Sequence, residues 1–235
     1  MIKGIYVAGR SLDQKMKNIS TVANNIANLN TTGYKREVPF LEILSQVSQP
    51  VVKDITDFNQ GDAIPTENPL DLFINGKGFF TIKTERGLEF TRNGKFNVSN
   101  DGFLVNDQGY RVMGRNGEIN LTTTKFDENQ TLSISKTGEI KIGEQPVDTL
   151  LIAHLDNLQQ PKRIDGASFI TVDDEFQLAG ESDFEIKQGY LEESNVNAII
   201  EMESMIQINK EYETASKMIA ALDQSLEKAV DIGRV

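Results

Sequence analysis

Residues 205–229 read MIQINKEYETASKMIAALDQSLEKA, and this stretch decides the fold. Its apolar residues recur at alternating steps of three and four, which places them on one face of a helix. This spacing is typical of a seam that packs lengthwise against a second helix. The seam positions are Met205, Ile208, Tyr212, Ala215, Ile219, Leu222, Leu226 and Ala229.

A matching stripe near the other end of the chain is the obvious partner for this seam. Its members are Ile5, Leu12, Met16, Ile19, Ala23 and Ile26. Residues 1–28 carry four basic residues and one acidic residue, whereas residues 197–232 carry three basic and seven acidic residues. Opposite net charges favour pairing of the two terminal helices, in one subunit or between subunits, mainly by setting partner choice and register.

The composition excludes several classes of protein. The chain has 235 residues, 38% of them hydrophobic, which suits a folded protein, and a formal net charge of −11, which argues against nucleic-acid binding. No apolar run approaches the roughly 20 residues of a membrane span, and no cleaved signal peptide is predicted at the N-terminus. With no Cys and one His, the sequence predicts no metal site and no cofactor.

Between the terminal stripes, from residue 70 onward, the apolar pattern has a period of two, which is typical of strands. Short apolar runs alternate with turns rich in Asn and Gly, which are strong hairpin signals. Hairpin turns are predicted at 75–78, 92–94, 106–109 and 136–138, another turn at 116–117, and further strands at 150–155 and 169–172. Turns that recur every eight to twelve residues predict a compact antiparallel β domain over residues 70–189.

The predicted fold class is therefore α+β, with terminal helices paired as a coiled coil around a central all-β antiparallel domain. Residues 1–35 and 190–235 form the helical domain, and residues 36–69, which hold four of the six prolines, form an extended linker with short strands. Within this linker, residues 40–47 fit either a short helix or an extended arm. Three good N-cap residues precede the last helix, namely Ser194, Asn195 and Asn197.

Four segments resemble the signatures of the bacterial flagellar rod and hook axial proteins. The first is Ala23–Lys35 (ANNIANLNTTGYK), and the second is Asn68–Phe80 (NPLDLFINGKGFF). The third is Phe90–Phe96 (FTRNGKF), and the fourth is Gly189–Asn197 (GYLEESNVN), followed by Glu201-Met202 and Met205-Ile206. The four segments stand in the family's order, whereas residues 115–188 carry little recognisable signature.

The resemblance implies a structural subunit that stacks helically with copies of itself and with neighbouring rod and hook proteins. It also implies that the β domain forms an outer layer of the filament and that the subunit leaves the cell through the flagellar export apparatus to reach the basal-body rod. Hook subunits of the family usually carry a further inserted domain, for which this chain has no room. A rod subunit is therefore expected, either the distal-rod protein or a minor proximal one, and residues 5–8 favour the proximal type. A hook or hook-associated subunit is the alternative within the family.

The candidate site is an assembly interface rather than a catalytic centre. The Asn-rich block, residues 24–30, can be a polar helix end that needs capping, but the family likeness favours amide hydrogen bonds between subunits. Residues expected at the interface are Ile5, Leu12, Ile19, Ala23, Asn24, Asn25, Ile26, Asn28, Met205, Tyr212, Ile219, Leu222 and Leu226.

Two other classes of protein remain as rivals. A secreted carbohydrate-binding or fibre module would present exposed aromatic platforms, but the chain has no Trp and five Tyr. A hydrolase with paired carboxylates would need two particular acidic residues, and none of the 35 stands out. His154 lies in a predicted strand without a second His or a Cys to complete a catalytic or metal site, so a structural role is expected.

Overall fold

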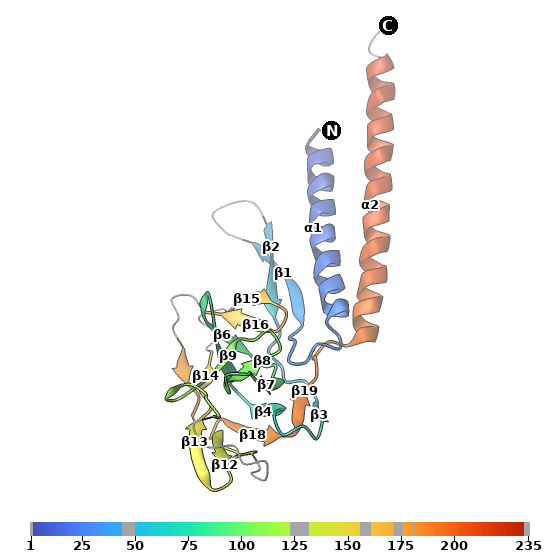
Figure 1. Ribbon diagram of the computed structural model, residues 1–235. Coiled ribbons are helices and arrows are strands. Elements are labelled where there is room, and N and C mark those ends of the chain that lie inside the picture. The colour runs from blue at the N-terminus through green and yellow to red at the C-terminus, as the bar shows by residue number, and fades with distance from the viewer. Residues whose placement is uncertain are drawn as a thin grey trace. The chain divides into compact units, whose positions relative to one another are not determined.

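A computed structural model describes residues 2–43, 50–122, 132–155, 161–171, 176–180 and 182–232 of the chain. The described residues form two units. Unit 1 comprises residues 1–29, 36–58 and 196–235, and unit 2 comprises residues 30–35 and 59–195. The two terminal helices belong to unit 1 and the large antiparallel β domain to unit 2 (Figure 1).

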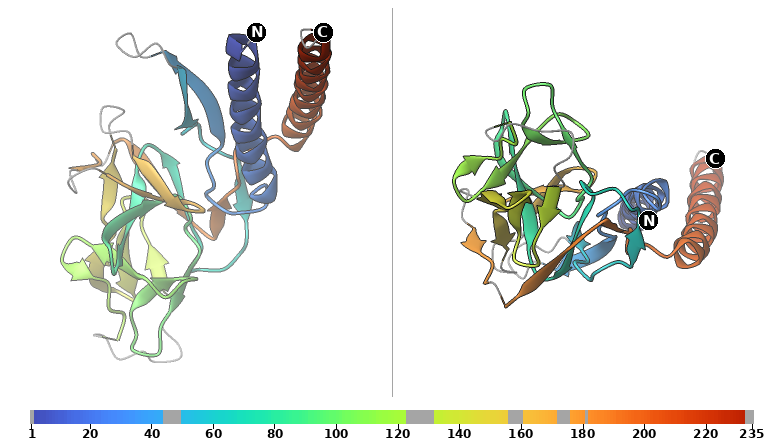
Figure 2. Two further views of the ribbon diagram at one scale, coloured as in Figure 1. Left: turned by 90° about the horizontal axis from the view of Figure 1, so that it is seen from above. Right: turned by 60° about the horizontal axis from the view of Figure 1, so that its bottom comes forward.

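Unit 1 is built on two long helices, α1 (Ile2–Ala27) and α2 (Ala198–Ile232). They lie side by side and run antiparallel, so that the N-terminus of α1 and the C-terminus of α2 are at the same end of the pair (Figure 2). Lys15 of α1 donates a hydrogen bond to the Glu211 carboxylate of α2. Neither these helices nor any other helix in the described part of the chain is long and apolar enough to cross a membrane.

The predicted N-cap of the last helix is confirmed at Asn197. Its side-chain oxygen accepts hydrogen bonds from the backbone N–H groups of Ile199, at 3.0 Å, and Ile200, at 3.2 Å. These are donors that the first turn of a helix would otherwise leave unsatisfied. The segment after α1 is turned by Gly33, whose φ of 69° lies in the left-handed region that glycine adopts readily.

A two-stranded antiparallel ribbon completes unit 1. Its strands are β1 (Glu37–Ile43) and β2 (Pro50–Thr56), paired from Glu37↔Thr56 to Ile43↔Pro50. An isolated hairpin is marginally stable, and here it packs against α1, where Thr21 Oγ1 donates to Asp54 Oδ1 at 2.8 Å. Residues 36–69 were expected as a linker, but the structure divides them between the two units. Within the expected helix or arm at 40–47, residues 40–43 are strand and residues 44–49 lie outside the described part.

Unit 2 contains a ten-stranded antiparallel sheet. Its main order is β15-β16-β6-β5-β9-β8-β7, while β10 pairs with β9, and β14 pairs with β5 and β17. The strands are β5 (Phe79–Thr84), β6 (Gly87–Thr91), β7 (Phe96–Val98), β8 (Leu104–Asn106), β9 (Arg111–Gly114), β10 (Gly117–Glu118), β14 (Ile152–His154), β15 (Lys162–Asp165), β16 (Ser168–Ile170) and β17 (Gln177–Leu178).

Three smaller sheets complete the described part of unit 2. One is the meander of β11 (Leu132–Ile134), β12 (Glu139–Ile142) and β13 (Gln145–Thr149). The other two join early strands to late ones: β4 (Leu72–Gly76) pairs with β18 (Phe184–Gln188), and β3 (Ala63–Pro65) pairs with β19 (Tyr190–Glu192). The beginning and the end of unit 2 are thus hydrogen-bonded to each other.

Two of the predicted hairpins are wrong. The turn at 75–78 separates two strands, but β4 pairs with β18 and β5 pairs with β6. Gly76 and Gly78 have φ values of 112° and 128°, and the chain passes from one sheet to another between them. The turn at 92–94 likewise connects β6 to β7, which pairs with β8 instead. The turns at 106–109 and 136–138 do join paired strands, so those two hairpins are confirmed, and the turn predicted at 116–117 lies where β9 and β10 pair.

The core of unit 2 lies where these sheets face one another. Apolar side chains from at least six strands are buried together, and Phe80 and Phe96 meet edge to face with ring centres 5.1 Å apart. The buried cluster includes Leu72, Ile74, Phe80, Ile82, Phe96, Val112, Ile140, Ile142, Ile152, Phe184 and Ile186. This core provides the rigid frame that positions the polar residues described next.

Candidate functional site

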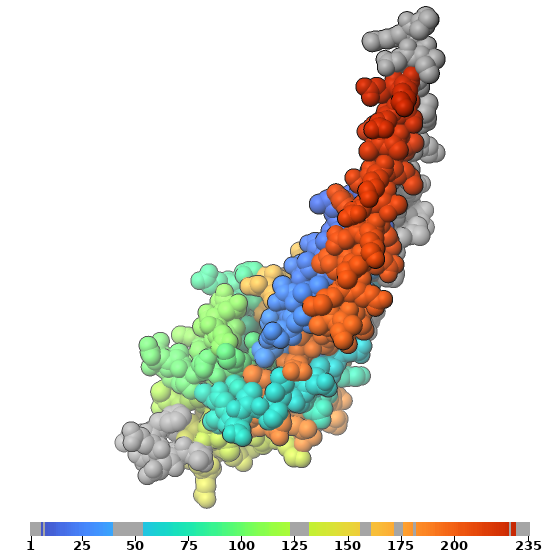
Figure 3. All heavy atoms as spheres, turned by 90° about the vertical axis from the view of Figure 1, so that its right-hand side faces the viewer, coloured from blue at the N-terminus to red at the C-terminus, as the bar shows by residue number. Residues whose placement is uncertain are grey.

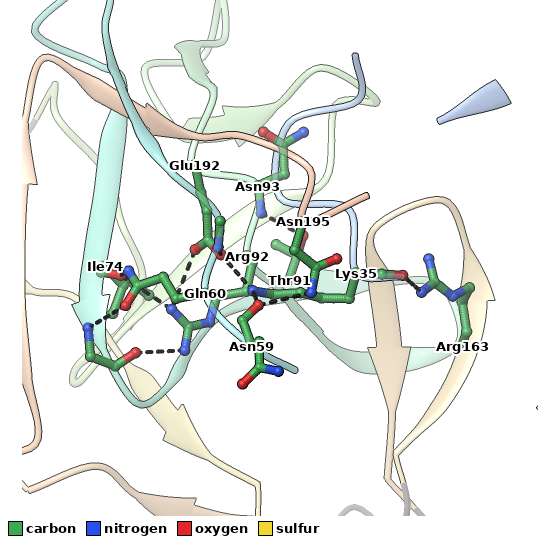
Figure 4. Close-up of polar contacts among 12 residues, drawn as sticks. Lys35, Asn59, Gln60, Ile74, Thr91, Arg92, Asn93, Arg163, Glu192 and Asn195 are labelled. Carbon is green, nitrogen blue, oxygen red and sulfur yellow. Dashed lines mark hydrogen bonds and ion pairs between the residues drawn. The ribbon is translucent and has the colours of Figure 1, made fainter. Parts of the chain in front are cut away.

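Three charged side chains from distant parts of the sequence meet inside unit 2, as Figure 4 shows. Lys35 Nζ lies 2.5 Å from Glu192 Oε1, and Arg92 Nη1 lies 3.4 Å from Glu192 Oε2. The side chains of Lys35 and Glu192 are each 1% exposed, and that of Arg92 is 5% exposed. We call these three residues the ion cluster.

Backbone groups satisfy much of the remaining hydrogen-bonding capacity of the ion cluster. Lys35 Nζ donates to the Asn59 carbonyl at 2.7 Å, and the Gly61 N–H donates to Glu192 Oε1 at 3.1 Å. Arg92 donates to the carbonyls of Ile74 at 3.1 Å and Gly76 at 2.7 Å. These bonds matter because a buried charge is tolerated only when it is paired and hydrogen-bonded.

The electrostatics of Arg92 reflect its burial. Desolvation lowers the pKa of its guanidinium below the ordinary value, and the nearby Glu192 carboxylate partly opposes this shift. The guanidinium also lies over the ring of Phe79, 5.1 Å from the ring centre. Arg92 is therefore held by a carboxylate, two carbonyls and an aromatic face, an arrangement that fixes its position.

Backbone bonds beside the ion cluster join the N-terminal segment 30–35 to the C-terminal segment 190–195. The Gly33 N–H donates to the Glu192 carbonyl at 2.8 Å, and the Asn195 N–H donates to the Tyr34 carbonyl at 3.4 Å. A Cβ at Gly33 would lie 2.3 Å from the Asn93 nitrogen, so the close approach of these segments requires glycine. The ion cluster thus holds together two of the segments through which unit 2 continues into unit 1.

Unit 1 has a second buried polar cluster. Glu201 of α2 is completely buried, and its carboxylate accepts from Arg36 Nε at 2.5 Å and from Asn25 Nδ2 at 3.2 Å. Asn25 also donates to the Glu37 carbonyl at 2.8 Å and accepts from the Glu37 N–H at 3.0 Å. Asn25 therefore connects α1 to both β1 and α2.

The Asn-rich block consequently divides into residues with different surroundings. Asn25 was expected to bond a neighbouring subunit, but it is completely buried and its amide is used within the chain. Asn28 is half-buried and donates to the Asn24 carbonyl at 2.8 Å, as a residue at a helix end does. The side chain of Asn24 is exposed, so for Asn24 and Asn28 an interface role stays a prediction.

The structure brings together much of the two predicted apolar stripes. Half-buried side chains of the first stripe, on α1, are Leu12, Ile19 and Ile26. Those of the seam, on α2, are Met205, Ile208, Tyr212, Ala215 and Ile219. From Gln207 to Leu222 the other positions of α2 are exposed, so the seam is the covered face of the helix there. Ala23 and Leu222 are exposed, and the side chains of Ile5 and Leu226 lie outside the described part.

A second set of large apolar residues on α2 is open to solvent. Ile199 is 78% exposed, and Ile200, Met202, Ile206 and Met218 are each at least half exposed. Figure 3 shows α2 in orange to red beside the blue α1, with much of the α2 surface uncovered. Ile199, Met202 and Ile206 follow steps of three and four, so they lie on one face of α2, and an exposed apolar face is typical of an interaction site.

Sequence reasoning missed the charged residues of both buried clusters. Lys35, Arg92, Glu192 and Glu201 all stand inside or beside the quoted signature segments, but charged residues are usually exposed, and nothing local marks these as buried. In the described part of the chain, no group of three His, Cys, Asp or Glu residues is placed to hold a metal ion. The two buried clusters are suited to joining chain segments that are distant in the sequence.

Three family models match separate parts of the chain. The model "Flagella basal body rod protein" matches residues 5–35. The model "Flagellar hook protein FlgE/F/G D1 domain" matches residues 73–142, and "Flagellar basal body rod FlgEFG protein C-terminal" matches residues 187–232. The ion cluster takes one residue from each matched region: Lys35, Arg92 and Glu192.

Individual relatives are similar over nearly the whole chain. "Flagellar basal-body rod protein FlgG" of Agrobacterium fabrum is 31% identical over 264 residues, which cover 95% of this chain and 96% of the relative. "Flagellar basal-body rod protein FlgF" of Rhizobium meliloti is 29% identical over 238 residues, which cover 98% of each chain. The FlgF protein of Caulobacter vibrioides is 30% identical over 250 residues, and the match covers both chains completely.

Proposed function

The chain belongs to the family of flagellar basal-body rod proteins and is a structural subunit of the rod, and from this premise we propose that subunits join through their terminal helices. The observation that carries this proposal is the exposed apolar surface of α2. A lone subunit leaves Ile199, Met202 and Ile206 in water, at a free-energy cost that burial against a neighbour would remove.

Within one subunit, we propose that α1 and α2 pair as an antiparallel coiled coil along the predicted seam. Support comes from the half-buried side chains of Leu12, Ile19, Met205, Tyr212 and Ile219. The hydrogen bond from Lys15 to Glu211 joins a basic helix to an acidic one, as the net charges of the two ends favour.

The interface between subunits would then use the surfaces that this pairing leaves open. Ala23 and Asn24 of α1 and Leu222 of α2 are exposed members of the predicted set, and half-buried Ile26 and Asn28 lie beside them. Ile5 and Leu226 are included on the sequence pattern alone. Asn25 is omitted, because its amide already bonds Glu37 and Glu201.

The role that follows is mechanical rather than catalytic. The family indicates assembly with other rod and hook proteins at the flagellar basal body. A tube of interdigitated helices is stiff, and we propose that it transmits torque from motor to hook while the β domain sets the outer packing. Passage through the flagellar export apparatus is part of the same proposal.

Among the rod subunits, we propose that this chain corresponds to the FlgF relatives. The alignment with the Rhizobium meliloti FlgF protein spans 238 positions, close to the 235 residues of the chain. The alignment with the Agrobacterium fabrum FlgG protein needs 264 positions for a similar share of the chain, and therefore many more gaps. Rescue of a strain that lacks FlgG, but not of one that lacks FlgF, would contradict this assignment.

The assembly proposal is tested with a variant of the exposed face. In Ile199→Glu/Met202→Glu, both new charges lie on exposed positions, so we expect the subunit to keep its circular-dichroism spectrum but to be missing from purified basal bodies. Asn209→Glu is the control, because it adds charge to an exposed polar position of the same helix. Normal incorporation and motility of the double variant would overturn the proposal.

A further inference from the structure

The last two strands of unit 2 pair with its first two strands. β18 pairs with β4 along its whole length, and β19 pairs with β3. Phe184 and Ile186 of β18 are buried in the same core as Leu72 and Ile74 of β4. A chain that ends before β18 lacks part of this core and leaves an edge of β4 without its hydrogen-bonding partner.

The ion cluster adds a second reason why closure of unit 2 depends on residues late in the sequence. Glu192 lies 157 positions after Lys35 and 100 positions after Arg92 in the sequence. If unit 2 closed before Glu192 joined it, the ammonium of Lys35 and the guanidinium of Arg92 would be buried without this carboxylate. Burial of unpaired charge is strongly unfavourable, so the open form is favoured until Glu192 arrives.

We propose that Glu192 is the closing residue of a folding switch in unit 2. During synthesis the chain leaves the ribosome with its N-terminus first. Unit 2 then stays open until Glu192 has emerged and paired with Lys35 and Arg92. The core strands β4 to β16 are present before that point, but the two cations oppose their final closure. The need for Glu192 therefore delays folding until nearly all residues of unit 2 have emerged. It goes beyond the proposed function and does not depend on rod assembly.

The first test compares two neighbouring glutamates in the full-length protein. Glu192→Gln removes the buried carboxylate and preserves the shape of the side chain, whereas Glu193→Gln changes an exposed side chain. We expect Glu192→Gln to raise hydrogen-exchange rates by about 100-fold or more throughout β4, β5 and β6, because breaking a buried ion pair destabilises the whole unit. Glu193→Gln leaves the rates unchanged. Faster exchange confined to residues 190–195 would overturn the proposal.

The second test uses the natural sequence during synthesis. Ribosome-bound chains are arrested so that the emerged part ends at residue 182, 189 or 195, and their resistance to protease is measured. We expect unit 2 to become resistant at 195 and to remain sensitive at 182 and 189. Glu192→Gln in the 195 chain preserves β19 but removes the charge, and it should stay sensitive. Resistance at 189, or in the 195 chain with Glu192→Gln, would show that Glu192 is not the closing residue.

Discussion

Lys35 and Arg36 are neighbours in the chain, yet their side chains pair with two different buried glutamates. Lys35 Nζ lies 2.5 Å from Glu192, and Arg36 Nε lies 2.5 Å from Glu201. The boundary between the two units falls between these neighbours. Each unit therefore has its own buried glutamate in an ion pair, and each pair joins a segment near one end of the chain to a segment near the other.

Lys35→Met tests the ion pair of unit 2. Loss of the ammonium removes a buried partner at 2.5 Å and leaves Glu192 with Arg92, at 3.4 Å, and the Gly61 N–H. We expect the free energy of unfolding of unit 2 to fall by about 3–5 kcal/mol, the usual cost of breaking a buried pair from one side. Urea unfolding followed by tyrosine fluorescence measures this change. Lys77→Met is the control because Lys77 is exposed, and a similar loss in both variants would contradict the prediction.

Asn25→Ala tests the polar cluster of unit 1. The substitution leaves the Glu37 N–H and carbonyl without their side-chain partner and removes a donor from the buried Glu201. We expect a loss of about 1–3 kcal/mol, since unsatisfied buried polar groups are costly. Hydrogen exchange at Glu37 and its neighbours in β1 is the direct measurement. Asn24→Ala, at the exposed position beside it, should change little, and equal effects of the two variants would argue against this role of Asn25.

Gly33→Ala tests the close approach of segment 30–35 to the β6–β7 connection. The left-handed φ of 69° alone disfavours alanine by roughly 1 kcal/mol, and the new Cβ would also collide with the Asn93 nitrogen. Gly109→Ala separates these effects, because Gly109 has a φ of 83° but open space around it. We therefore expect a clearly larger drop in melting temperature for Gly33→Ala. Equal drops would mean that the close approach contributes nothing.

The contact of Lys15 with Glu211 predicts a pH dependence of the helix pair. Hydrogen bonding to Lys15, and then to Gln207, lowers the pKa of the Glu211 carboxyl below its ordinary value of 4.5. A carboxylate whose pKa is lower in the folded state contributes stability above the unfolded pKa and loses it as the pH falls through the folded pKa. Pairing of α1 and α2 should therefore weaken as the pH falls below about 4.5.

The measurement is the helical circular-dichroism signal of the wild-type chain and of Glu211→Gln across this pH range at low salt. Glu211→Gln cannot titrate at this position, so the difference between the two curves isolates the contribution of Glu211. High salt should reduce the difference, since the pair is partly exposed. Superimposable curves at low salt would contradict the prediction.

Much of the fold was predictable because it depends on local pattern. The steps of three and four that predicted the last helix agree with α2, and Asn197 caps it as its residue type suggested. The hairpin turns at 106–109 and 136–138 were also predicted correctly, because each joins strands that are adjacent in the sequence. The turns at 75–78 and 92–94 have the same chemistry, but their strands pair with more distant partners.

The sequence by itself determined two terminal helices, a strand-rich middle and the family to which the chain belongs. Only the tertiary structure decided that β4 pairs with β18, that Asn25 faces inward, and that Lys35, Arg92 and Glu192 meet in one buried cluster. The physical reason is that helix and turn formation depend on neighbouring residues. Pairing of distant strands and burial of charge depend on the packing of the whole unit, which no local pattern records.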